Sequence, residues 1–129
     1  MGTEATTPRA VTMIYVESPK RSKAFFRDEV GLAMTVDGGA YAEFEWGNLI
    51  LGLRWRDNAR NQFADAVAPA GTGASHQITV VVDDVDAVAR AMVSRGLDLD
   101  EAPTDRAWGL RSATFRDPDG HLFEVGSLT

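Results

Sequence analysis

Apolar positions divide the chain into two series of short elements that follow the same order. In the first series, an apolar, β-rich run predicts a strand, and Ser18 followed by Pro19 predicts a helix that ends at Gly31. Two later stretches, separated by a tight-turn signal at Gly47, have the composition and alternation of strands. The predicted elements are a strand over 11–16, a helix over 18–30, a short strand before 38, and strands over 41–46 and 49–55.

The second series begins after a polar connector rich in glycine, alanine and proline, in which a short helix is predicted over 61–67. Asp83 and Asp84 predict the start of a helix that Gly96 ends, and Pro103 is predicted to break a short strand. The predicted elements are a strand over 77–82, a helix over 83–95, a short strand over 97–99, and strands over 110–116 and 121–125.

The two series form an internal repeat, which is the most informative feature of the sequence. The step from the first strand to the helix-ending glycine is 15 residues from Val16 to Gly31 and 14 from Val82 to Gly96. Each series predicts a βαβββ module that is too small to bury both its helix and its sheet. We expect an α+β fold in which the two modules form a curled mixed sheet, with helices outside and a concave groove inside. The chain divides into a flexible arm (1–9), a first module (10–56), a connector (57–75) and a second module (76–129).

Composition narrows the function classes. The chain has 129 residues, of which 44% are hydrophobic and 25% charged, as in one globular domain. It contains no cysteine, which excludes disulfides, thiolate nucleophiles and cysteine-ligated metal sites. A net charge of −6 argues against binding to nucleic acid. No apolar run reaches the ~20 residues that span a bilayer and the first residues lack a signal-peptide core, so a cytoplasmic location is expected.

Three stretches carry a resemblance to a known family. They are residues 15–26 (YVESPKRSKAFF), 82–87 (VDDVDA) and 117–124 (DPDGHLFE). In this order they resemble the vicinal oxygen chelate (VOC) superfamily, which includes glyoxalase I, bleomycin-resistance proteins and extradiol dioxygenases. The resemblance covers nearly the whole chain from about residue 10. It implies the paired βαβββ fold, a homodimer and a ligand in the cupped sheet, but it implies no single chemistry.

The resemblance also implies where enzymes of the family hold a divalent metal, on the first and last strand of each module. In the first module the positions fall at Val11 and at Leu51, or at Gly52 after a shift of one residue, and none of these has a donor atom. In the second module they fall at Gln77 and Glu124, which do have donors. Because a catalytic metal usually needs three protein ligands, no metal cofactor is expected.

A bound metal remains the minority alternative. If the strand register is misassigned, His76 and His121 join Gln77 and Glu124 as weak candidate ligands. Both histidines are otherwise predicted to point away from the groove, because successive strand residues alternate between the two faces.

Strand alternation also predicts which residues line the groove and bind a ligand. These positions are mainly apolar, with a few polar groups: Met13, Tyr15, Leu51, Leu53, Gln77, Thr79 and Glu124. Trp108 joins them because it precedes a strand, where a loop lies over the groove mouth. Glu124 is interpreted as a groove carboxylate, as a partner of an arginine such as Arg54 or Arg111, or, in an enzyme, as a general base.

We therefore expect a protein that binds a small, largely apolar or aromatic molecule without a metal, as bleomycin-resistance members sequester an antibiotic. The alternative is an enzyme, either a metal-dependent glyoxalase-like lyase or a ring-cleaving dioxygenase. A third hypothesis, a protein-interaction module, has no positive signal in the sequence. The expected partners are a small organic ligand and a second copy of the chain, with no nucleic acid and no membrane.

Overall fold

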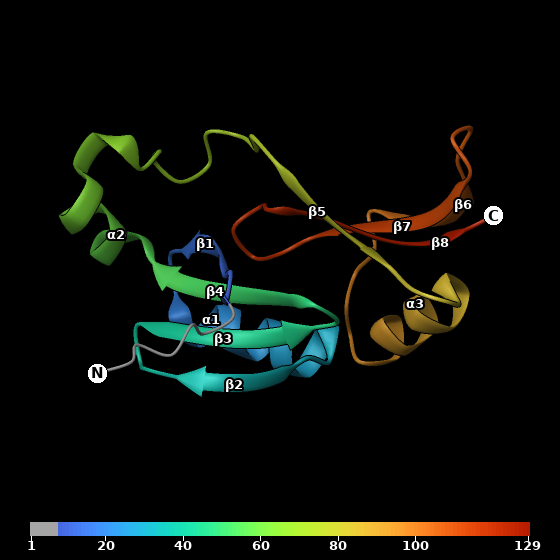
Figure 1. Cartoon of the computed structure of the whole chain (residues 1–129), viewed down its shortest axis with the longest axis horizontal. Coiled ribbons are helices and arrows are strands. Elements are labelled where there is room, and N and C mark those ends of the chain that lie inside the picture. Colours follow the sequence, from blue (N-terminus) through green and yellow to red (C-terminus); the bar gives the residue numbers. More distant parts are fainter. Residues whose placement is uncertain (1–7) are drawn as a thin grey trace, which may run out of the picture.

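The structure is a computed structural model that describes residues 8–129 and contains two successive βαβββ modules (Figure 1). Of the predicted flexible arm, residues 1–7 lie outside the described residues. The first module comprises β1 (Thr12–Val16), α1 (Pro19–Ala24), the π-helix η1 (Phe25–Val30), β2 (Ala33–Asp37), β3 (Tyr41–Trp46) and β4 (Leu49–Trp55). The connector contains α2 (Arg56–Phe63) and the 3-10 helix η2 (Ala64–Ala66). The second module comprises β5 (Gln77–Val81), α3 (Val85–Ser94), β6 (Glu101–Asp105), β7 (Leu110–Arg116) and β8 (Leu122–Leu128).

Each module folds its strands into one four-stranded mixed sheet with the same order. The order is β1-β4-β3-β2 in the first sheet and β5-β8-β7-β6 in the second. The first strand of each module pairs in parallel with the last, and the other pairs are antiparallel. Figure 1 shows α1 beside the first sheet and α3 beside the second. The predicted α+β fold of two βαβββ modules is confirmed.

The first helical segment begins and ends where its local sequence predicts. The Ser18 hydroxyl accepts a hydrogen bond from the Arg21 amide at 3.2 Å, and Gly31 adopts a positive φ of 88° at the end. After Ala24 the helix widens to a π-helix, which the hydrogen bond from the Gly31 amide to the Phe26 carbonyl closes. Both members of the Phe25–Phe26 pair, at the start of this segment, are buried.

Aromatic side chains from both modules meet in one core around Phe123 on β8. Its ring centre lies 5.5 Å from that of Phe26 and 5.2 Å from that of Phe115. Trp46, at the end of β3, stacks on Phe123 at 6.0 Å. Because two of these partners belong to the first module, the modules share a hydrophobic core and neither buries its own faces alone.

Two predicted elements are placed differently in the structure. The predicted strand over 97–99 is wrong, and the strand lies instead at β6, which contains Pro103. β6 tolerates proline because it is an edge strand, and among the described strands it pairs with β7 alone. The connector helix begins at Arg56, directly after β4, rather than at Asn61. None of the helices in the described part of the chain is long and apolar enough to cross a membrane.

If the aromatic core joins the two modules, Phe123→Ala will lower the free energy of unfolding by about 3–5 kcal/mol, because it removes a buried ring between them. Urea denaturation followed by circular dichroism measures the change. Phe63→Ala is the matched control, since Phe63 on α2 is 46% exposed and its loss should cost no more than about 1 kcal/mol. Equal losses in the two variants would contradict the shared core.

Candidate functional site

Each sheet turns one face to the shared core and leaves the other face open. In the first sheet, β1 and β4 pair so that Ile14 lies opposite Leu53, and both are 1% exposed. The next pair, Met13 and Gly52, lies on the other face, where Met13 is 43% exposed. Tyr15 shares that face by strand alternation. The predicted groove positions Met13 and Tyr15 therefore do lie on an open face.

The placement of Leu51 and Leu53 on the groove face is wrong. Both side chains belong to the core, with exposures of 0% and 1%. The error comes from matching the turn glycines of the two modules. Gly47 is the first residue of a two-residue link between β3 and β4, whereas Gly120 is the fourth residue of a five-residue link between β7 and β8. Turns of different length shift the count by one, which moves a side chain to the opposite face.

Strand pairing gives the correct equivalence between the modules. Gly52 lies opposite Met13 on β1, in the same way that Glu124 lies opposite Thr79 on β5. The first-module counterpart of Glu124 is therefore Gly52. This position has no side chain, and an added Cβ would lie 2.8 Å from the Val11 side chain and 2.9 Å from the Met13 sulfur. Apolar side chains fill the space where a ligating side chain would stand.

On the open face of the second sheet, the predicted residues Gln77, Thr79 and Glu124 do come together. The Thr79 hydroxyl donates to Glu124 Oε1 at 3.0 Å and accepts a hydrogen bond from the Gln77 amide at 3.2 Å. Ser112 on β7 donates to Glu124 Oε2 at 2.8 Å and itself accepts a hydrogen bond from Arg106 Nε at 2.9 Å. Both carboxylate oxygens of Glu124 are therefore occupied by hydroxyl donors.

The sequence did not single out Ser112 or Arg106, although alternation along β7 places Ser112 beside β8. The predicted arginine partners of Glu124 are wrong. Arg54 donates to Asn58 at 2.9 Å, and Arg111 forms an ion pair with Asp86 at 2.9 Å. Arg111 lies on the core side of β7, next to α3, so it cannot reach the open face.

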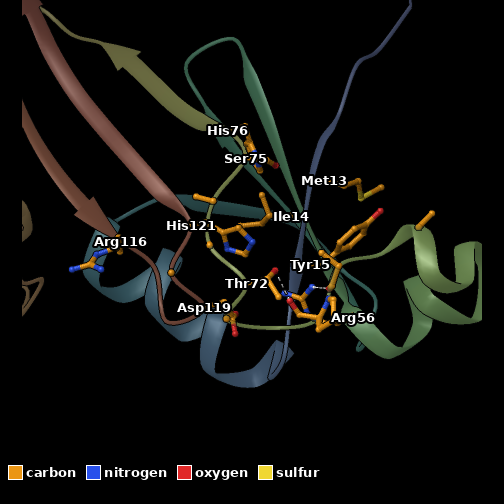
Figure 2. Close-up of a pocket in the computed structure, with 17 residues that line it drawn as sticks. Met13, Ile14, Tyr15, Arg56, Thr72, Ser75, His76, Arg116, Asp119 and His121 are labelled. Atoms are coloured by element: carbon orange, nitrogen blue, oxygen red, sulfur yellow. Dashed lines mark hydrogen bonds between the residues drawn. The ribbon is translucent and has the colours of Figure 1, made fainter.

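A cleft of about 450 Å³ lies between β1, the connector and the link from β7 to β8 (Figure 2). Met13 and Tyr15 line it from β1, and Arg56 lines it from the start of α2. Arg56 donates to the Ala68 carbonyl at 2.5 Å and forms an ion pair with Glu17, which fixes the connector beside the cleft. The cleft thus combines apolar and aromatic contact from a strand with polar groups from the segments around it.

Both histidines line this cleft from the second module, with ring centres 6.4 Å apart (Figure 2). His121 Nδ1 lies 2.8 Å from Oδ2 of the buried Asp117 carboxylate, which also accepts the His121 amide at 2.7 Å. A carboxylate oxygen accepts, so Nδ1 is the donor in this pair, and Nε2 is left to contact a ligand. Asp117 also shapes the turn between β7 and β8, because its carboxylate accepts the Asp119 amide at 3.1 Å. Burial raises the pKa of Asp119, which accepts a hydrogen bond from the Glu17 amide.

The residues present do not fit the divalent metal that the resemblance implies. Among residues 8–129 there is no group of three or more His, Cys, Asp or Glu side chains that could hold a metal ion. Val11 and Gly52 offer no donor, and both oxygens of Glu124 accept hydrogen bonds from neutral hydroxyls. At the fourth position, Gln77 offers a carbonyl oxygen, which is a weak ligand by itself.

The open face of the first sheet carries a buried carboxylate that sequence reasoning missed. Glu43 on β3 lies opposite Gly52, and only 8% of its side-chain surface is exposed. It accepts hydrogen bonds from the Tyr41 hydroxyl and from Arg9. Burial raises the pKa of Tyr41 to about 12, and the Tyr41 hydroxyl, followed by Arg9, holds the pKa of Glu43 below its usual range. Alternation of Tyr41 and Glu43 along β3 was the available signal.

Trp108 lies apart from these groups. It is 72% exposed at the tip of the hairpin between β6 and β7, and it is not among the residues that line the cleft. The structure therefore places Met13 and Tyr15 in the cleft beside β1 and brings Gln77 and Thr79 into the hydrogen-bonded network around Glu124. Leu51 and Leu53 lie in the core, and Trp108 lies outside both places.

Comparisons with protein-family models and with solved structures identify proteins that share this fold. A model of the glyoxalase/bleomycin resistance protein/dioxygenase superfamily matches residues 9–125. A family enzyme of that description from Burkholderia phytofirmans PsJN has a similar structure, with a TM-score of 0.78 and 16% identity over 95% of this chain and 100% of that one. Lactoylglutathione lyase from Agrobacterium tumefaciens gives 0.71 and 22% over 96% of each chain.

TnmS3, an antibiotic binding protein from Streptomyces sp. CB03234, gives a TM-score of 0.70 and 22% identity over 98% of this chain and 100% of that one. Comparison with curated proteins finds no significant match to the sequence. Identities this low establish only a shared fold, whereas the family model spans almost the whole chain. The chain therefore belongs to the glyoxalase/bleomycin resistance protein/dioxygenase superfamily.

Proposed function

We propose that this protein binds a small, largely apolar or aromatic molecule and that it does so without a metal. The observation that carries the proposal is the donor set at the four positions where the family's enzymes hold their metal. Val11 and Gly52 have no donor, and Glu124 is already hydrogen-bonded through both oxygens. A carboxylate held in this way orients a hydrogen-bonding surface, and within residues 8–129 too few further ligands stand near it to build a catalytic metal site.

The cleft beside β1 is the proposed binding place. Its volume of about 450 Å³ falls within the range of pockets for small organic ligands. Tyr15 offers a ring for stacking, and Met13 offers a polarisable, adaptable contact. Polar groups at its border, including Thr72 and His121 Nε2, are available to fix the orientation of a ligand. The fold that this chain shares with the antibiotic binding protein TnmS3 supports sequestration as its role.

A second copy of the chain is the proposed protein partner. The open face of the second sheet exposes apolar side chains from two neighbouring strands, Val81 (56%), Leu122 (40%) and Leu128 (76%). Apolar groups gathered on one side of a protein favour association. The homodimer that the family resemblance implies would cover such a face.

Native mass spectrometry of protein purified without chelator should show a chain free of metal, before and after addition of Ni²⁺, Zn²⁺, Mn²⁺ or Fe²⁺. The reason is that no three ligands converge among the described residues. The same spectrum should show twice the mass of one chain if the homodimer forms. One metal ion per chain that resists desalting would overturn the metal-free proposal, and its loss in Glu124→Gln would identify the enzyme alternative.

Ligand binding is tested by thermal-shift measurements with a panel of aromatic natural products. A compound at about 100 times its Kd should stabilise the protein by about 2.7 kcal/mol and raise its Tm by several degrees. Tyr15→Ala should weaken the binding of any hit at least about tenfold, because it removes the aromatic wall of the cleft. Trp108→Ala is the control outside the cleft and should leave the shift unchanged. If Trp108→Ala abolishes the thermal shift and Tyr15→Ala does not, the ligand binds at the hairpin between β6 and β7.

A further inference from the structure

We propose that Glu43 is a recognition site for a cationic group of the ligand, and that Arg9 of the chain itself occupies this site in the free protein. The inference rests on the proposed function, because it adds a charge requirement to small-molecule binding on the open face of the first sheet. The ligand class that it names is an aromatic or apolar molecule that bears an ammonium or guanidinium group.

The carboxylate of Glu43 is buried in a way that requires a partner. Only 8% of its side-chain surface is exposed, and an unpaired charge at such a position is costly. The Tyr41 hydroxyl satisfies one oxygen but is neutral, and its pKa of about 12 keeps it protonated at physiological pH. Within residues 8–129, Arg9 is the cation that pairs with Glu43 and neutralises its charge.

Arg9 is suited to leave this position. It precedes β1 and belongs to no helix or strand, and 56% of its side-chain surface is exposed although the carboxylate beneath it is covered. Because the exposed guanidinium of Arg9 keeps much of its hydration, little is lost when another cation takes its place beside Glu43. A ligand cation that brings additional apolar contact therefore has an advantage over the guanidinium of Arg9.

The surroundings of Glu43 provide that apolar contact. Val11 and Met13 lie over Gly52, next to the carboxylate, and a Cβ at Gly52 would stand within 3 Å of both. Met13 also lines the cleft proposed for ligand binding. A ligand that stacks in the cleft and extends past Met13 would thus bring a cationic end toward Glu43.

This feature is specific to the first module. The residue of β7 that corresponds to Glu43 is Thr114, because Thr114 lies opposite Glu124 just as Glu43 lies opposite Gly52. In the second module, the carboxylate is that of Glu124 on the last strand, β8, and hydroxyl groups donate hydrogen bonds to it. In the first module, the carboxylate is that of Glu43 on β3, the strand next to the last one, and it pairs with the cation of Arg9. The fold repeats, but the two open faces recognise different groups.

The test compares two probes with the same aromatic part, 1-naphthylmethylammonium and neutral 1-naphthylmethanol. Their affinities are measured by calorimetry at low salt for the wild type, Arg9→Ala, and the double variant Arg9→Ala/Glu43→Gln. Arg9→Ala should bind the ammonium probe about tenfold more tightly than the wild type does, since a charge-assisted hydrogen bond to Glu43 becomes available. Binding of the alcohol should stay within about twofold. The double variant should lose the gain.

Arg27→Ala is the matched control, because it removes an arginine that pairs with Asp28 on the surface and changes the net charge by the same amount. An equal preference for the ammonium probe in Arg9→Ala and Arg27→Ala would overturn the inference. If the double variant does not fold, this comparison decides alone, since both single variants keep Glu43. Failure of the ammonium probe to bind Arg9→Ala would also overturn the inference, while the panel of neutral aromatic compounds tests the proposed function separately.

Discussion

Packing of aromatic rings around Phe123 is the constraint on which the rest of the structure depends. Phe123 and its neighbour Val125 face the core, so the residues between and beside them, above all Glu124, must face outward. A slip of one residue in β8 would bury a carboxylate and expose a phenylalanine at the junction of both modules. The core thereby determines the chemistry of the open face, because each ring buried on one side fixes the polar group presented on the other.

The two modules have kept the same backbone and changed the side chains on their open faces. In the second module, Thr79 and Ser112 surround Glu124 with hydroxyl donors, which hold its carboxylate in a fixed orientation. In the first, Gly52 removes the equivalent side chain, and Glu43 supplies a carboxylate from the adjacent strand. A fold with two such faces can lose the ligand set of a metal enzyme and still bind small molecules, since binding needs only shape and a few polar groups.

Local signals in the sequence predicted most of the fold. Ser18 and Gly31 marked the ends of the first helix, since capping depends on a single residue and its immediate neighbours. The face of β4 was not predictable in the same way, because it depends on the length of a turn and on pairing with β1, which are properties of two segments together. Glu43 was missed for a related reason. A glutamate in an alternating strand is typical of an exposed position, and its partner Arg9 lies in a segment without periodicity.

In the proposed site, the pairing of Glu43 with Arg9 gives selectivity for cationic ligands at some cost in affinity, because the ligand must displace Arg9. A buried carboxylate cannot remain unpaired, so the guanidinium of Arg9 can leave only when another cation takes its place. A neutral aromatic molecule must therefore bind with Arg9 still present, and a ligand that carries an anion meets the buried carboxylate as well as the net charge of −6 on the chain. The internal cation thus stabilises the free protein and excludes ligands of the wrong charge, which is discrimination by an unfavourable alternative.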